Sequence, residues 1–82
     1  MNKNVLLITG ASSSIGQEVI KKFIKKNDII IATFNKKNFK VDKTLQSKII
    51  KFKVDFNNKD ELEKFIYQLN KKSLIPNKIL HI

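Results

Sequence analysis

The sequence has 82 residues with 17 basic and 7 acidic side chains, a net charge of +10, no cysteine and one histidine. A chain of this length has room for one small domain. The absence of cysteine excludes disulfide-stapled folds and thiolate zinc sites, and the lone His81 excludes histidine-cluster sites, so we expect no metal site.

The positive charge comes entirely from lysine, because the chain contains no arginine. Arginine grips phosphates bidentately and hydrogen-bonds guanine edges, so a basic nucleic-acid binder is the least favoured interpretation and no nucleic-acid partner is expected. We interpret the lysines as solvated faces of the fold.

The N-terminal apolar run covers residues 5–8 only. A secretory signal needs roughly 7 to 15 apolar residues and a transmembrane helix about 20, so the run satisfies neither requirement. We therefore expect a cytoplasmic location and no membrane partner.

The first third of the chain alternates between two kinds of apolar pattern. Residues 5–8 are a continuous apolar run and residues 29–33 a continuous β-branched run, both typical of strands covered on both faces in a parallel sheet. Between them, a serine at position 12, 13 or 14 is expected to cap a helix that Asn27 ends in a left-handed conformation. The apolar face of this helix consists of Ile15, Val19, Ile20, Phe23 and Ile24.

The rest of the chain repeats this alternation. Residues 36–47 are polar and predict a loop with a short helix, whereas residues 50–56 alternate between apolar and polar, as in an edge strand. Asn58 and Glu61 form a variant of the capping box ahead of a second helix. The apolar face of that helix consists of Leu62, Phe65, Ile66 and Leu69. Residues 79–82 begin another strand, so we expect residues 1–82 to be a domain truncated within its fourth strand.

The segment Thr9-Gly10-Ala11-Ser12-Ser13-Ser14-Ile15-Gly16 lies between the first strand and the first helix. A helix N-terminus offers unpaired N–H groups to a phosphate, and glycine permits the tight turn before it. A Walker A loop is excluded, because Gly16 is followed by Gln17 and not lysine.

This segment resembles the T-G-x-x-x-G-x-G motif of the classical short-chain dehydrogenase/reductase family, with Ser14 in place of the middle glycine. The resemblance implies a Rossmann-like α/β fold, here a partial parallel sheet of three to four strands in the order 3-2-1-4 with flanking helices. It implies that a dinucleotide cofactor binds at Gly10, Ser12, Ser13, Ser14, Ile15 and Gly16. If φ is positive at position 14, a serine there costs about 1 kcal/mol of strain. If the residue touches the pyrophosphate, its side chain either crowds the cofactor or donates a hydrogen bond to it.

Two further segments fit this resemblance. Asp55 stands where the family has an acid that accepts a hydrogen bond from adenine, with Phe56 beside the ring; the alternative is that Asp55 only caps the following turn. At the end of the second strand, an acid in the family favours NAD and a base favours NADP. Asn35 and Lys36 stand at this place in the chain, so NADP is the favoured cofactor and NAD the alternative.

No catalytic residue is expected in this chain. Tyr67 and Lys71 match the family's Y-x-x-x-K by letter, but they fall too early, so we interpret them as a partly buried ring and a helix-end cation. His81 is assigned a packing role because no acid or cysteine is near it in sequence.

The resemblance therefore implies the NAD(P)-binding N-terminal portion of an oxidoreductase. The full-length protein would transfer hydride between NAD(P)H and a carbonyl or alcohol. An oligomer is possible only for that full-length protein. We expect the chain alone to be inactive. The alternative is a non-catalytic nucleotide-binding or interaction module.

Overall fold

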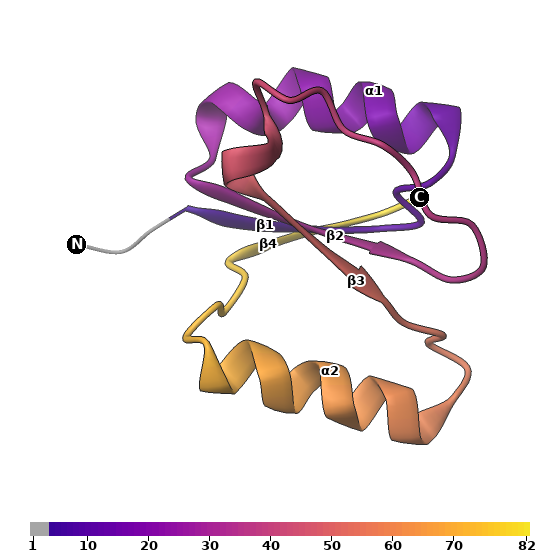
Figure 1. The fold of residues 1–82 in the computed structure, drawn as a ribbon. Coiled ribbons are helices and arrows are strands. Elements are labelled where there is room, and N and C mark those ends of the chain that lie inside the picture. The colour runs from indigo at the N-terminus through magenta and orange to yellow at the C-terminus, as the bar shows by residue number, and fades with distance from the viewer. Residues whose placement is uncertain (1–3) are drawn as a thin grey trace.

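The computed structural model describes residues 4–82, which form a four-stranded parallel sheet between two helices. The elements in chain order are β1 (Val5–Thr9), α1 (Ser14–Phe23), a 3-10 turn (Ile24–Lys26), β2 (Ile29–Phe34), a 3-10 turn (Gln46–Lys48), β3 (Ile49–Lys53), α2 (Lys59–Lys71) and β4 (Lys78–His81). The strand order is β3-β2-β1-β4, and all three strand pairs are parallel. This confirms the predicted Rossmann-like α/β sheet (Figure 1).

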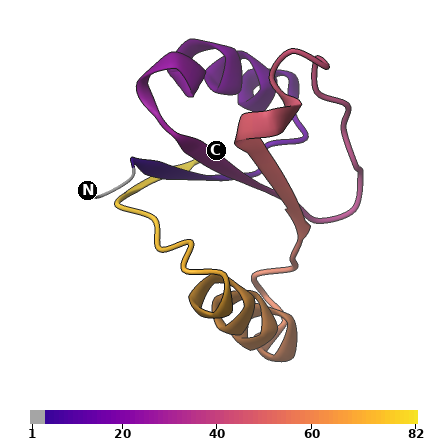
Figure 2. The same ribbon diagram turned by 60° about the vertical axis from the view of Figure 1, so that its left-hand side comes forward.

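The two helices cover opposite faces of the sheet (Figures 1 and 2). Side chains alternate along a strand, so β1 sends Leu6 and Ile8 to the core beneath α1, and Val5 and Leu7 to the core beneath α2. All five residues of β1 are buried, as predicted for a strand covered on both faces.

The predicted edge strand is also confirmed, because β3 pairs with β2 alone, but it ends at Lys53 and does not include residues 54–56. Ile50 and Phe52 face the core beneath α2, where the Phe52 ring meets Phe65 edge-on with centroids 5.2 Å apart. Lys51 and Lys53 are exposed. Lysines on such a strand discourage edge-to-edge pairing with another chain.

The first turn of α1 differs from the sequence prediction. Ile15 was assigned to the buried face, yet its side chain is 66% exposed. The residues of α1 and the turn after it that are buried against the sheet are Gly16, Ile20 and Ile24, four residues apart, which places Ile15 about 100° around the helix from this stripe.

The prediction for Asn27 was wrong. Its backbone is extended, with φ −127° and ψ 146°, and its side-chain Nδ2 donates to the Phe23 carbonyl at 2.9 Å. The side chain therefore satisfies a carbonyl at the helix end without a left-handed residue. Within the described residues, the non-glycine position with positive φ is Ser73, at 56°, just after α2.

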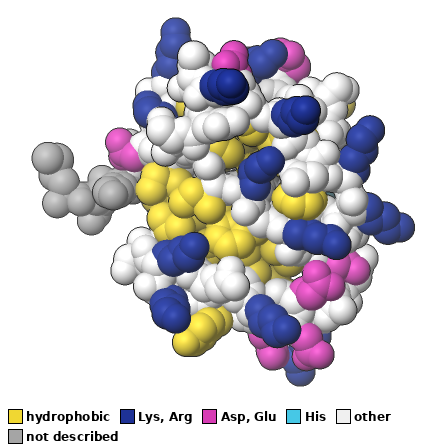
Figure 3. All heavy atoms as spheres, in the orientation of Figure 1, with side chains coloured by type: hydrophobic (Ala, Val, Ile, Leu, Met, Phe, Trp, Pro, Cys, Tyr) yellow, Lys and Arg dark blue, Asp and Glu magenta, His cyan; other side chains and the backbone are white. Residues whose placement is uncertain are grey.

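The lysine side chains are spread over the surface. On the face shown in Figure 3 they are scattered among neutral and acidic side chains and do not merge into one continuous patch. No helix within residues 4–82 is both long and apolar enough to cross a lipid bilayer.

Candidate functional site

The candidate site lies at the carboxyl edge of the sheet, where the segments after β1, β2 and β3 meet (Figure 1). The Ala11 amide donates to the Thr33 carbonyl at 3.0 Å, which fixes the turn after β1 against the end of β2. The Val54 amide donates to the Phe34 carbonyl at 2.9 Å and holds the end of β3 beside β2. In open parallel sheets, ligands bind at this edge.

The turn after β1 requires glycine at its first position. Gly10 has a φ of +72°, in the left-handed region where a β-carbon is strained. A β-carbon there would also lie 2.7 Å from the carbonyl oxygen of Ile82.

The second glycine sets the approach of α1 to this turn. A β-carbon at Gly16 would lie 2.7 Å from both the Cα and the carbonyl oxygen of Ala11, which is itself fully buried. Gly16 therefore lets the first turn of α1 rest directly on the backbone at the end of β1.

Ser13 is the N-cap of α1, one of the three serines predicted for that role. Its Oγ accepts from the Gly16 amide at 3.0 Å and donates to the Gly10 carbonyl at 3.2 Å. Within the described residues, the amides of Ser14 and Ile15 make no hydrogen bond, as expected at the start of a helix. These amides and the positive end of the helix dipole make the turn suitable for an anion.

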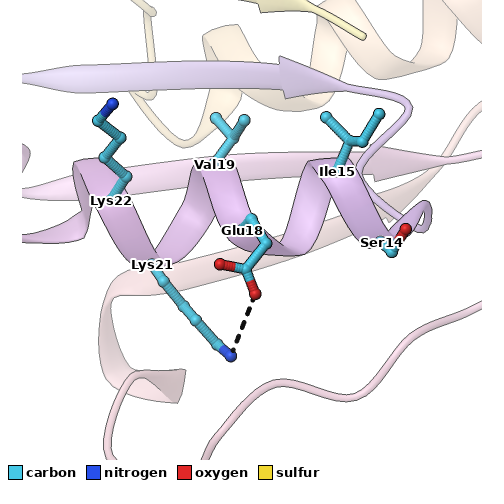
Figure 4. Close-up of a pocket in the computed structure, with 6 residues that line it drawn as sticks. All are labelled: Ser14, Ile15, Glu18, Val19, Lys21 and Lys22. Carbon is cyan, nitrogen blue, oxygen red and sulfur yellow. Dashed lines mark ion pairs between the residues drawn. The ribbon is translucent and has the colours of Figure 1, made fainter.

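Ser14, which replaces a glycine of the motif, causes no backbone strain. It is the first residue of α1, its φ is not positive, and its side chain is exposed. In Figure 4, Ile15, Val19 and Lys22 line one side of α1, while Glu18 and Lys21 form an ion pair of 3.7 Å on another. The hollow along this helix lies beside the glycine turn and not over it.

The end of β2 carries basic and amide side chains but no acid. Asn35, Lys36 and Lys37 are exposed and follow the last residue of the strand. They lie at the same sheet edge as the glycine turn.

Asp55 follows β3 and is half-buried. Its Oδ1 accepts from the Asn57 amide at 3.0 Å, so the carboxylate caps the following turn, as the alternative interpretation held. The second carboxylate oxygen, Oδ2, has no hydrogen-bond partner within residues 4–82. Phe56 is 40% exposed, and its ring packs edge-on against Phe65 with centroids 6.0 Å apart.

The capping box at α2 is only half formed. Asn58 Oδ1 accepts from the amides of Asp60 and Glu61, as predicted for an N-cap. Glu61, however, accepts from the Asp55 amide at 3.3 Å instead of the Asn58 amide, which donates to the Asp55 carbonyl. The acid therefore supports the turn that carries Asp55.

Tyr67 and Lys71 lie on α2, away from the glycine turn. The prediction of a partly buried ring was wrong, because Tyr67 is 65% exposed: the buried stripe of α2 runs through Phe65 and Leu69. Lys71 is the last residue of the helix, as expected.

His81, at the end of β4, is exposed, and its Nδ1 forms a hydrogen bond with Thr9 Oγ1. Within residues 4–82, no three side chains of His, Cys, Asp or Glu lie together as metal ligands would.

Two residues that hold the segments of this site in place were not predicted from the sequence. Ala11 anchors the turn to β2 and packs on Gly16, and its small size, five residues before a glycine, was the available signal. Lys51 contacts the loop after β2, and no pattern in the sequence distinguishes it from the other lysines.

Comparison with known proteins identifies the family. A family model described as short chain dehydrogenase matches residues 4–77. The chain belongs to the short chain dehydrogenase family. Its Rossmann-like sheet, with the glycine turn between β1 and α1, is the part of that fold present here.

Two solved structures, one of them a short chain dehydrogenase, share this fold. One, from Leptospira borgpetersenii serovar Hardjo-bovis (strain JB197) with bound NAD+, is 21% identical with a TM-score of 0.82; the match covers 99% of this chain and 31% of that one. A ketoreductase domain from the bacillaene assembly line is 16% identical with a TM-score of 0.73, and the match covers 95% and 21%. This chain therefore spans less than a third of either structure. No curated protein matches it.

Proposed function

We propose that this chain is the cofactor-binding N-terminal portion of an NADP-dependent oxidoreductase. The observation that carries the proposal is the glycine turn. Gly10 is left-handed, Gly16 rests on Ala11, and Ser13 leaves the amides of Ser14 and Ile15 free at the N-terminus of a ten-residue helix. Free backbone N–H groups at a helix N-terminus are suited to binding the negatively charged pyrophosphate.

The flanking residues support an adenosine site on the same edge. The free Oδ2 of Asp55 is an acceptor suited to the adenine amino group, and the half-exposed ring of Phe56 offers an apolar surface beside it. Ser12 lies in this turn and Ile15 in the first turn of α1, so both are included in the proposed pyrophosphate site.

The segment after β2 supports NADP over NAD. Asn35 and Lys36 are exposed there, and no acid lies beside them. The lysine offers a cation to the 2′-phosphate of NADP, and no carboxylate is available to bind the ribose hydroxyls of NAD. NAD+ bound to the Leptospira structure supports a nicotinamide dinucleotide of either kind.

The chemistry of the full-length enzyme is hydride transfer between the nicotinamide and a carbonyl or alcohol. Its acid and base groups would come from outside residues 1–82, so we expect no reductase activity from this chain alone. The cytoplasmic location stays a prediction from the sequence.

The test is calorimetric titration of NADP+ into the chain and into Asp55→Asn. Asparagine keeps the Oδ1 acceptor for the Asn57 amide but replaces the free oxygen with a donor. We expect affinity for NADP+ to fall about tenfold, the size of a hydrogen bond to a charged group.

The variant separates a site from general attraction to a positive surface, because it makes the chain more positive. Asp42→Asn is the matched control, since Asp42 Oδ1 accepts from the Thr44 amide in a similar turn. Tighter binding of NADP+ by both variants would mean attraction to bulk charge and would contradict the proposal.

A further inference from the structure

Lys51 connects β3 to the loop that follows β2. Its Nζ donates to the Phe39 carbonyl at 2.7 Å and to Asn38 Oδ1 at 3.2 Å, and lies 5.3 Å from the centroid of the Phe39 ring. Its own backbone is fixed, because Lys51 is paired with Ala32 in the sheet. The ammonium therefore ties the loop to a rigid strand.

The contacted end of the loop is itself well anchored. Phe39 is 6% exposed, belongs to the core beneath α1, and packs edge-on against Phe34 with centroids 6.1 Å apart. Asn38 Oδ1 also accepts from the Phe39 amide at 2.7 Å. Lys51 thus adds two hydrogen bonds and a cation–π contact to a turn that is already compact.

The consequence concerns the three residues between these anchors. Residues 35–37 are exposed and belong to no helix or strand. They are held at one end by Phe34, the last residue of β2, and at the other by Asn38 and Phe39. A short segment fixed at both ends has few backbone conformations, so its backbone loses little entropy when the segment binds an anion.

We propose that Lys51 is a positioning residue that holds residues 35–37 in place and thereby sets the preference of the site for NADP over NAD. This inference rests on the proposed function. Lys51 acts through Asn38 and Phe39 without contacting the cofactor. Loss of the Lys51 ammonium should weaken binding of the 2′-phosphate. It should not change binding of the part that NADP and NAD share.

The experiment compares three variants of this chain by calorimetric titration of NADP+ and NAD+. Lys51→Met removes the ammonium and keeps the apolar stem, and Lys51→Arg restores a donor. Lys48→Met makes the same charge change at an exposed residue of the 3-10 turn just before β3. For Lys51→Met we expect about fivefold weaker NADP+ binding and NAD+ binding within twofold of wild type. Arginine should recover most of the loss, and Lys48→Met should leave the NADP+ to NAD+ ratio unchanged.

A second measurement needs no cofactor. Hydrogen exchange at the Phe39 amide should be about fivefold faster in Lys51→Met than in wild type, because the turn opens more often. Unchanged exchange, equal losses for both dinucleotides, or the same ratio change in Lys48→Met would each overturn the inference.

The failure of the proposed function would be seen separately, in the wild-type titrations. A wild-type chain that binds neither dinucleotide contradicts both the proposed function and this inference. A wild-type chain that binds NADP+, with a ratio that Lys51→Met does not change, contradicts this inference only.

Discussion

Gly16 lies so close to Ala11 that a β-carbon at position 16 would be 2.7 Å from the Ala11 Cα and carbonyl oxygen. The atoms in the way belong to the backbone, which cannot move aside as a flexible side chain can. Ala11 is in turn tied to β2 by its hydrogen bond to Thr33. The distance between α1 and the sheet edge is therefore set at this contact.

Gly16→Ala should destabilise the fold. Overpacking costs about 1–3 kcal/mol, and the higher helix propensity of alanine returns up to about 1 kcal/mol. We expect the free energy of unfolding in urea to fall by about 1–2 kcal/mol. The matched control, Ser14→Ala, changes an exposed position of the same turn and should stay within about 0.5 kcal/mol of wild type. Equal stability of both variants would contradict the close contact.

Gly10→Ala tests the left-handed turn. The φ of +72° costs an L-residue about 1–2 kcal/mol, and the new β-carbon also meets the Ile82 carbonyl. We expect unfolding free energy to fall by about 2 kcal/mol. Gly10→Asn should lose less, because asparagine tolerates this conformation better. If Gly10→Asn lowers the unfolding free energy as much as Gly10→Ala does, the effect comes from the contact with Ile82 alone and not from the left-handed backbone.

Ser13 offers a way to separate stability from binding. Ser13→Ala removes the cap on the Gly16 amide and should cost about 1 kcal/mol of unfolding free energy. Ser13→Asp keeps an acceptor at the helix N-terminus and should preserve stability. Its carboxylate would repel a pyrophosphate, so we expect at least fivefold weaker NADP+ binding in calorimetry. Unchanged binding by Ser13→Asp would place the anion elsewhere.

How far the sequence predicts this structure depends on the range of the interaction involved. The strands β1 and β2 were predicted because burial on both faces demands unbroken apolar runs. The position of the glycine turn follows from its place between an apolar run and a helical pattern, whereas the order of the strands came from the resemblance to a known family.

The predictions that the structure contradicts concern helix faces and helix ends, which depend on contacts between elements. Ile15 and Tyr67 are apolar or aromatic residues beside a helical stripe, and which neighbours are buried depends on the packing angle of the helix. Asn27 satisfies the helix end through its side chain, and Glu61 supports Asp55 across a turn. These choices are made in three dimensions and leave no periodic pattern in the sequence.

Lys36 is the residue on which the proposed cofactor preference depends most. Lys36→Glu places an acid where the ribose hydroxyls would bind and a 2′-phosphate would be repelled. We expect NADP+ affinity to fall at least tenfold and NAD+ affinity to change less than threefold. Lys43→Glu, the same charge change in an exposed turn further along the loop, should reduce both affinities equally and only slightly. An equal effect of the two variants would argue against a 2′-phosphate at Lys36.

The most direct test of the account is a titration of the isotopically labelled chain with NADP+, followed through its backbone amide resonances. We predict the largest shifts at the amides of residues 12–16, with further shifts at residues 35–37 and 55–57, and saturation at a single affinity. Pyrophosphate alone should shift only the first group. Shifts spread over the lysine-bearing faces of α1 and α2, without saturation and abolished by moderate salt, would contradict a built dinucleotide site.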